Sequence, residues 1–284
     1  MTVTVISGGT DGMGRALLQA RLARGDHVVA IGSNPDKGRA IQALSERVHF
    51  LRVDLSSVAA TRAAIGFIKE RWPVIDALAL FANRPVPRRI QTVEGLEQTF
   101  ALYYLSRYLL SHGLREALDR AERPVIINVA GVGITKGTIH WDDLQLQSRY
   151  RMIDAQLQAG RANDLLGVDF AENSGSRARY VLYHPGFTRS GDLTPLPTPI
   201  RMAIRAVSVF ARPVERSIAP IVGWIDHPPT APLTANDRGR PVPLTIPTLD
   251  SAAARRLSTV TAELLARLTA PNGSSDGVTS IHTG

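Results

Sequence analysis

The 284-residue chain is 44% hydrophobic, which suits one large globular domain or two small ones. It has no cysteine, which excludes disulfide bonds, thiol catalysis and cysteine-ligated metals, and we expect no metal site. The net charge of +8 comes almost entirely from arginines scattered along the chain, which favours a solvated basic surface over nucleic-acid binding. The first residues lack the pattern of a signal peptide, and no run has the ~18–20 apolar residues of a membrane span. We therefore expect a soluble cytoplasmic protein that binds no membrane.

Short apolar segments alternate with helical patterns along the first two thirds of the chain. Near-continuous apolar strands joined by helices are typical of a parallel sheet covered on both faces, and right-handed crossovers make such a sheet doubly wound. The fold class is therefore α/β. Strands are predicted at 3–7, 27–32, 48–54, 75–82, 124–131 and 179–185, and helices at 12–24, 36–45, 57–71, 94–112, 113–121 and 149–173.

The pattern changes after Gly186, where prolines become frequent. Residues 187–247 are predicted to form a lid over the substrate, with helices at 200–211 and 214–226; the alternative is a rigid elaboration that only packs on the core. A helix at 250–269 closes the fold, so that 1–270 make one domain. Residues 271–284 are predicted to be a disordered tail.

A glycine-rich turn, SGGTDGMG at 7–14, joins the first strand to the first helix. Its glycines have the spacing G-x-x-x-G-x-G, which lets backbone N–H groups approach a pyrophosphate at the helix N-terminus. Tight turns in general favour glycine, but the position after the first strand favours a nucleotide site. The predicted phosphate-binding residues are Ser7, Gly8, Thr10, Asp11, Gly12, Met13 and Gly14.

The end of the second strand predicts which dinucleotide is bound. A carboxylate there would bind the ribose 2′-hydroxyl and repel a 2′-phosphate. The chain instead has Ser33 and Asn34, with Lys37 and Arg39 nearby, which favours NADPH over NADH, although Asp36 is also close. After the third strand, Asp54 can accept a hydrogen bond from the adenine amino group. It could also cap the next helix, a role that Ser56 or Ser57 suits better.

These motifs together resemble the short-chain dehydrogenase/reductase family over roughly residues 1–190. VDLSS at 53–57 is similar to its adenine-contact segment, EGLEQTFALYYLSRYLL to its fourth helix, INVAG to its fifth strand and HPGFTRS to its Pro-Gly segment. GTIHWDDLQ followed by GRAND is most similar to the retinol-dehydrogenase-like branch. The resemblance implies a Rossmann-type fold and adds cofactor contacts at Leu55, Ala82, Asn83, Pro185, Gly186, Phe187 and Thr188.

The active-site motifs of that family are missing. The family's helix asparagine, strand serine, tyrosine and lysine align, in that order, with Tyr103, Gly131, Gln156 and Gly160. No lysine in the chain has a tyrosine four residues before it, so a shifted alignment does not restore the pair. Loss of a general acid typically costs about 10²–10⁴-fold, whereas positioning alone supplies about 7–11 kcal/mol. Ketone reduction is therefore weakened but not forbidden, and the catalytic residues stay unassigned.

The missing proton donor can be replaced in two ways. A substrate phenol beside the ketone can polarise the carbonyl through an internal hydrogen bond, with the last proton coming from water. Protein candidates are Tyr103, Tyr104, His140 and Tyr150, of which Tyr103 is favoured because its position faces the site in the family. Tyr103 and Gln156 are the predicted substrate contacts.

This chain, which is rich in arginine and proline and lacks all four active-site groups, resembles the angucyclinone ketoreductases of antibiotic biosynthesis. This resemblance implies NADPH-dependent reduction of a polycyclic aromatic ketone. The alternatives are a non-catalytic nucleotide-binding or scaffold protein and a non-redox catalyst such as an isomerase or cyclase. The expected partner is a small aromatic ketone, and the sequence leaves the oligomeric state open.

Overall fold

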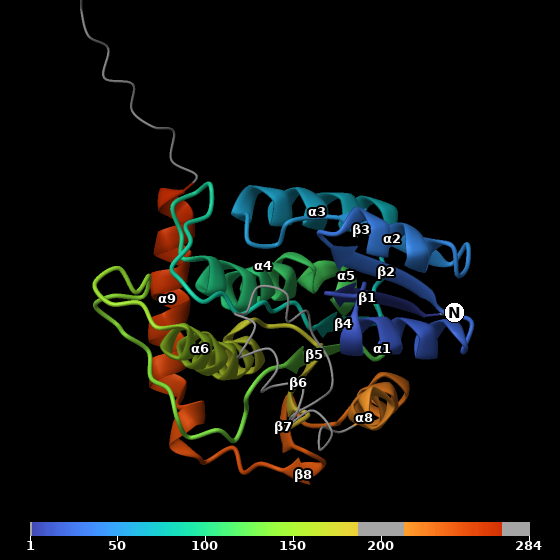
Figure 1. Ribbon diagram of the computed structural model, residues 1–284. Coiled ribbons are helices and arrows are strands. Elements are labelled where there is room, and N and C mark those ends of the chain that lie inside the picture. Colours follow the sequence, from blue (N-terminus) through green and yellow to red (C-terminus); the bar gives the residue numbers. More distant parts are fainter. Residues whose placement is uncertain (1, 187–212, 269–284) are drawn as a thin grey trace, which may run out of the picture.

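The computed structural model describes residues 2–186 and 213–268, and their strands form one sheet with the order β3-β2-β1-β4-β5-β6-β7-β8 (Figure 1). The first seven strands in this order are parallel, and β8 is antiparallel to β7. The chain order reverses between β1 and β4, which confirms the doubly wound α/β fold. The strands are β1 (Val3–Ser7), β2 (His27–Gly32), β3 (Val48–Arg52), β4 (Ala77–Leu80), β5 (Val125–Val129), β6 (Arg179–His184), β7 (Leu233–Asp237) and β8 (Arg240–Pro241).

Helices cover both faces of this sheet. The first layer contains α1 (Gly12–Leu22), α2 (Pro35–Gln42) and α8 (Val214–Asp226). The second contains α3 (Val58–Arg71), the π-helix η1 (Phe100–Leu105) continued by α4 (Ser106–Gly113), then α5 (Arg115–Asp119) and α6 (Met152–Asn173). The short η3 (Pro247–Leu249) leads into α9 (Ser251–Arg267), which packs along α6 (Figure 1).

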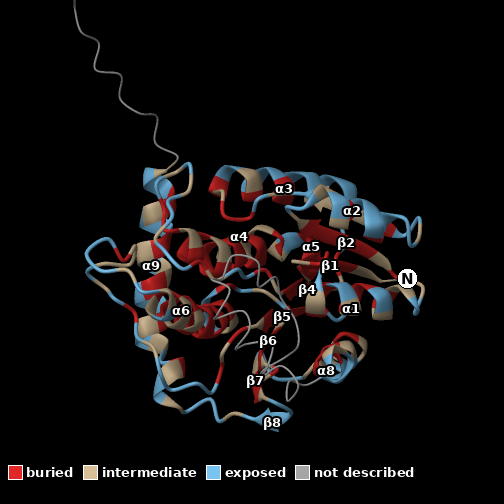
Figure 2. Cartoon of the chain, in the orientation of Figure 1, coloured by how far each residue is buried: buried red, intermediate tan, exposed pale blue. Residues whose placement is uncertain are grey.

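The central strands β1, β4 and β5 are almost continuously apolar because helices cover both faces of the sheet there. Val5 of β1 belongs to the core under α3, α4 and α6, whereas its neighbour Ile6 belongs to the core under α1 and α8. Both side chains are fully buried, as are most residues of the central strands β1, β4 and β5 (Figure 2). Adjacent residues of a strand point to opposite faces, so a strand buried on both faces needs no polar alternation.

Polar side chains fix where several helices begin. Asp11 caps α1 by accepting from Gly12 N at 2.7 Å, and Asn34 caps α2 by accepting from Asp36 N at 2.9 Å. Ser57 caps α3, as the sequence predicts, by accepting from Ala60 N at 3.2 Å. Two of these caps stand directly after β1 and β2, so the helices start at the edge of the sheet where those strands end.

One helix differs from the sequence-based expectation. The helix expected at 94–112 starts later, because the buried carboxylate of Glu97 accepts from Thr99 N and Phe100 N, each at 2.7 Å, and its first part is a π-helix. Within the segment 187–247, expected to form a lid, the helix expected at 214–226 is present as α8, and β7 and β8 extend the sheet. The remainder of that segment, including the helix expected at 200–211, lies outside the described residues, as does the tail.

Candidate active site

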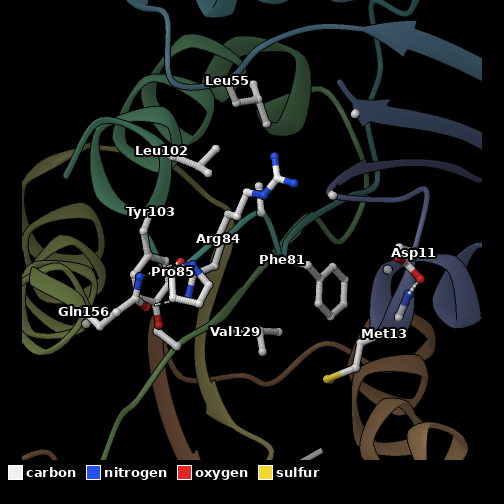
Figure 3. Close-up of a pocket in the computed structure, with 18 of the residues that line it drawn as sticks. Asp11, Met13, Leu55, Phe81, Arg84, Pro85, Leu102, Tyr103, Val129 and Gln156 are labelled. Atoms are coloured by element: carbon white, nitrogen blue, oxygen red, sulfur yellow. Dashed lines mark hydrogen bonds between the residues drawn. The ribbon is translucent and has the colours of Figure 1, made fainter. Parts of the chain in front are cut away.

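A cleft of about 940 Å³ opens at the carboxyl ends of the parallel strands. Crevices outside these strand ends are where open α/β sheets bind ligands. Figure 3 shows Asp11 and Met13 at one end of the cleft and Tyr103 and Gln156 at the other. The predicted cofactor residues that line it are Gly8, Thr10, Asp11, Gly12, Met13, Gly14, Ser33, Asn34, Asp54, Leu55, Ala82, Asn83, Pro185 and Gly186. Ser7 lies beneath the lining with its hydroxyl 3.4 Å from Ala82 N, and Phe187 and Thr188 lie outside the described residues.

The glycine turn forms one end of the cleft, and its shape depends on missing side chains. Gly8 has φ +72° and donates to Ile31 O at 2.9 Å. A Cβ on Gly14 would stand 2.2 Å from Gly8 O, so no larger residue fits. The N–H groups of Met13 and Gly14 open the helix and have no acceptor among the described residues, which is the arrangement that a phosphate requires.

The region beyond β2 carries a positive group but also a competing carboxylate. Lys37 lines the cleft and forms an ion pair with Asp11. Asn34 uses its side-chain oxygen to cap α2, so its amide N–H₂ remains as the donor. Arg39 is paired with Asp36, is exposed and does not line the cleft. Of these two cations beyond β2, Lys37 and not Arg39 lies within reach of a ligand in the cleft.

The four positions where family motifs are missing come together in this cleft: Tyr103 from η1, Gly131 after β5, and Gln156 and Gly160 from α6. Gln156 and Asn83 exchange two side-chain hydrogen bonds, of 2.9 and 3.2 Å. A Cβ at Gly160 would meet no heavy atom of the described residues within 4 Å, so among these residues the space beside the helix is open there.

Tyr103 faces the cleft with little exposure. Burial raises the pKa of its phenol, the Arg107 guanidinium opposes this shift, and Asp164 adds to it. That guanidinium stands 4.6 Å from the centre of the ring. The Tyr103 hydroxyl makes no hydrogen bond within 2–186 and 213–268, so it is available to a ligand.

Sequence reasoning missed a set of buried polar residues beneath the cleft. Arg107 is fully buried and donates to Val129 O at 2.8 Å, to Ala82 O at 3.0 Å and to the side-chain oxygen of Asn128. Burial lowers the pKa of Arg107 to about 10. Asn163 donates to Tyr103 O at 2.8 Å and joins α6 to η1. The only signal in the sequence was an arginine within the apolar run YLSRYLL.

Comparison with known proteins identifies the family. Residues 2–142, about half of the chain, match the sequence profile described as "short chain dehydrogenase". The chain belongs to the short-chain dehydrogenase/reductase family. A protein from Mycobacterium Paratuberculosis of known crystal structure shares this fold, with a TM-score of 0.69, 21% identity and 93% of each chain covered.

Several curated members of the family are similar in sequence. A Streptomyces sp. (strain C5) protein named "Putative daunorubicin C-13 ketoreductase DnrU" is 29% identical over 265 residues, 89% of this chain and 88% of that protein. Human polyprenol dehydrogenase is 28% identical over 52% of this chain and 48% of its own length. Mouse retinol dehydrogenase 11 is 27% identical over 66% of this chain and 62% of its own length. The aligned region spans less than two thirds of the length of the polyprenol and retinol dehydrogenases. This short-chain dehydrogenase/reductase is an NAD(P)-dependent oxidoreductase.

Three other candidate acids of this short-chain dehydrogenase/reductase do not line the cleft. Tyr104 is buried against α9, where its hydroxyl is 2.8 Å from that of Thr261, and burial raises its pKa. Tyr150 donates to Val86 O at 3.0 Å, and His140 lies in a separate pocket. Tyr103 is thus the one sequence-predicted acid in the described part of the cleft. Among residues 2–186 and 213–268, no helix is long and apolar enough to cross a membrane.

Proposed function

We propose that this protein is an NADPH-dependent ketoreductase of a large aromatic polyketide, of the angucyclinone type made in simocyclinone biosynthesis. The observation that carries the proposal is the shared cleft, in which a glycine turn suited to a pyrophosphate continues into the four altered positions. A chain that had lost its chemistry would not need both ends of the cleft open. The name of the Streptomyces relative, a daunorubicin ketoreductase, supports an aromatic polyketide as the substrate.

The described residues fit a dinucleotide phosphate. The free N–H groups of Met13 and Gly14 would bind the pyrophosphate, and Ser33 and Lys37 would bind a ribose 2′-phosphate. Asp54 is oriented because its Oδ1 accepts from Ser56 N at 2.9 Å and Ser56 Oγ at 2.7 Å. Its other oxygen would accept from the adenine amino group.

When bound, the dihydronicotinamide supplies a hydride, and the protein's own residues mainly orient and shield the ketone. The Gln156–Asn83 pair gives the cleft a fixed polar wall, and the Tyr103 hydroxyl offers a hydrogen bond to the substrate. An amide at 156 cannot replace a phenolic acid. We therefore propose that a phenol on the substrate, hydrogen-bonded to the ketone, activates the carbonyl.

The test compares an aromatic ketone that carries a neighbouring phenol with its O-methyl ether. Loss of NADPH absorbance gives the rate, and NADPH fluorescence gives cofactor binding. We expect methylation to lower kcat by about 100-fold or more and Tyr103→Phe to lower it by less than about tenfold. Equal rates for the phenol and its ether would contradict the proposed activation.

The second candidate is a non-catalytic nucleotide-binding or scaffold protein, which is favoured by the loss of all four family groups at positions 103, 131, 156 and 160. The same absorbance and fluorescence assays distinguish the two candidate functions. NADPH binding with no turnover of any ketone in a broad aromatic panel would support this second candidate and contradict the first.

A further inference from the structure

One face of α6 presents three residues to the cleft: Gln156, Gly160 and Asp164. Residues four apart on a helix are neighbours on one face. Gly160 has no side chain, and a Cβ there would meet no atom of residues 2–186 and 213–268 within 4 Å. Open space among these residues therefore lies beside the helix between the other two. The cleft therefore reaches from the amide pair of Gln156 to a buried carboxyl group.

Asp164 is half satisfied. Its side chain is only 2% exposed, and Oδ2 accepts from Arg161 Nη1 at 2.9 Å. Oδ1 is buried without a hydrogen-bond partner among the described residues. A buried carboxylate oxygen without a partner is costly, so this atom calls for a proton or a hydrogen-bond donor. Burial raises the pKa of Asp164 to about 7, although Arg161 opposes the shift.

Arg161 holds the carboxyl group in place and cannot easily serve its second oxygen. The guanidinium also donates to Ile134 O at 3.0 Å, Gly137 O at 3.3 Å and Thr248 O at 3.4 Å. These carbonyls come from the loop after β5 and from η3, so the guanidinium is anchored on two sides. Asp164 is thus fixed with one oxygen on Arg161 and the other unused.

We propose that Asp164 supplies the proton of the reaction, through a water molecule or a substrate hydroxyl in the space beside Gly160. This inference rests on the proposed ketone reduction. The carbonyl carbon gains the hydride and the C=O π bond breaks. The carbonyl oxygen takes a proton from the water molecule or substrate hydroxyl, which in turn takes a proton from Asp164 Oδ1. A bound dihydronicotinamide would supply the hydride and be oxidised. The Asp164 carboxylate that remains is paired with Arg161 and takes a proton back from solvent. Asp164 thereby stands in for the acid that is missing at position 156.

Other charged or titratable groups face this part of the cleft. Tyr103 comes from η1 and is backed by Arg107, Lys136 comes from the loop after β5, and His184 at the end of β6 is hydrogen-bonded to Asp237 at 2.8 Å. Because His184 lines the same cleft, the pH profile is also measured in His184→Asn. A change that persists in that variant belongs to another group.

The experiment uses Asp164→Asn, with Asp169→Asn as the matched control. Asp169 is also a buried aspartate of α6, but it does not line the cleft. Infrared difference spectra, recorded between about pH 5 and about pH 8 without substrate, report the protonated carboxyl group directly. NADPH oxidation with an aromatic phenolic ketone gives kcat over the same range. A second variant, Gly160→Leu, fills the open space and leaves the ion pair intact.

We expect a carboxyl band that disappears as pH rises through about 7, is retained in Asp169→Asn and is absent in Asp164→Asn. The wild-type kcat should fall over the same range, also in His184→Asn. Asp164→Asn should be about 10–100-fold slower and independent of pH. Gly160→Leu should keep the band and lower kcat.

Absence of the band, or unchanged rates in Asp164→Asn, would overturn the inference. If Asp164→Asn does not fold, an unchanged kcat in Gly160→Leu would overturn it. A wild-type protein that shows the band but reduces no ketone would contradict both the proposed function and the role of this proton.

Discussion

Asn83 and Gln156 hold each other by two reciprocal hydrogen bonds in the lining of the cleft, one from Asn83 Nδ2 to Gln156 Oε1 at 2.9 Å and one from Gln156 Nε2 to Asn83 Oδ1 at 3.2 Å. Asn83 follows β4 and Gln156 belongs to α6, so the two residues are far apart in sequence. Gln156 occupies the position of the family's acid, but its amide is already committed to a neighbour. It therefore shapes the cleft rather than donating a proton.

Replacement of Gln156 by Ala should consequently leave most of the chemistry. We expect KM for the ketone to rise about fivefold, because a net hydrogen bond contributes about 1 kcal/mol, and kcat to change by less than about tenfold. Asn83→Ala should raise KM to a similar extent. In the double variant, the loss should be smaller than the sum of the two single losses in free energy, because the two residues share the same hydrogen bonds. A loss in kcat of about 1,000-fold in Gln156→Ala would identify it as a direct participant.

Two glycines of the cleft predict opposite outcomes for the same substitution. Gly14→Ala places a Cβ 2.2 Å from Gly8 O and should weaken NADPH binding by about 100-fold or more, as measured by fluorescence titration. Gly160→Ala adds a Cβ in a helix interior that meets no atom of the described part of the chain within 4 Å, so it should raise the free energy of unfolding by about 0.5–1 kcal/mol. Tight NADPH binding by Gly14→Ala would show that the turn does not hold the phosphates.

Lys37 should decide the choice between the two dinucleotides. Its ammonium lines the cleft beyond β2, where a ribose 2′-phosphate would lie, and it is paired with Asp11. Lys37→Ala should weaken NADPH binding by about tenfold and leave NADH binding within about twofold. Arg39→Ala is the matched control, because Arg39 is paired with Asp36 away from the cleft. Equal losses for both cofactors in Lys37→Ala would contradict this role.

Arg107 should matter for stability more than any surface arginine. Arg107→Met leaves Ala82 O, Val129 O and Asn128 without their donor and should lower the free energy of unfolding by about 2–4 kcal/mol. Arg24→Met removes a half-exposed partner of Asp226 and should cost less than about 1 kcal/mol. Urea unfolding of both variants measures the contrast, and equal losses would contradict the structural role of Arg107.

The raised pKa of Asp164 predicts a pH dependence of stability. The folded state holds this pKa near about 7, above the unfolded value of about 3.9, so folding favours the protonated carboxyl group. Its stabilising contribution is full below about pH 4 and is lost as pH rises towards about 7. The unfolding free energy of the wild type, relative to Asp164→Asn, should therefore fall by a few kcal/mol across this window and stay level above it. A constant difference in urea unfolding would contradict the shifted pKa.

The sequence was sufficient for the features that follow from strand ends. The glycine turn, Ser33 and Asn83 each follow a parallel strand, and such ends meet at one edge of a sheet, so their convergence in the cleft could be expected. The family alignment likewise brought Tyr103 and Gln156 together from distant segments. Strand bounds at 3–7 and 27–32 were correct because both runs are apolar and end at polar or glycine residues.

The buried charges could not be predicted in the same way. Arginines are usually exposed, and Arg107 is satisfied by backbone carbonyls that only the folded sheet brings together. Arg161 and Asp164 are three residues apart, a spacing that is equally typical of a solvated helix face. The late start of the helix before Tyr103 depends on the Glu97 carboxylate, which accepts from first-turn N–H groups that have no acceptor within the helix.

The most direct test of ketone reduction without a tyrosine–lysine pair is an isotope transfer. The purified chain is mixed with a phenolic polycyclic ketone and NADPH that carries deuterium at the transferred position of the nicotinamide. We predict an alcohol that is heavier by one deuterium at the carbinol carbon, formed in step with NADPH loss. Firm NADPH binding with no deuterium in any product would contradict it.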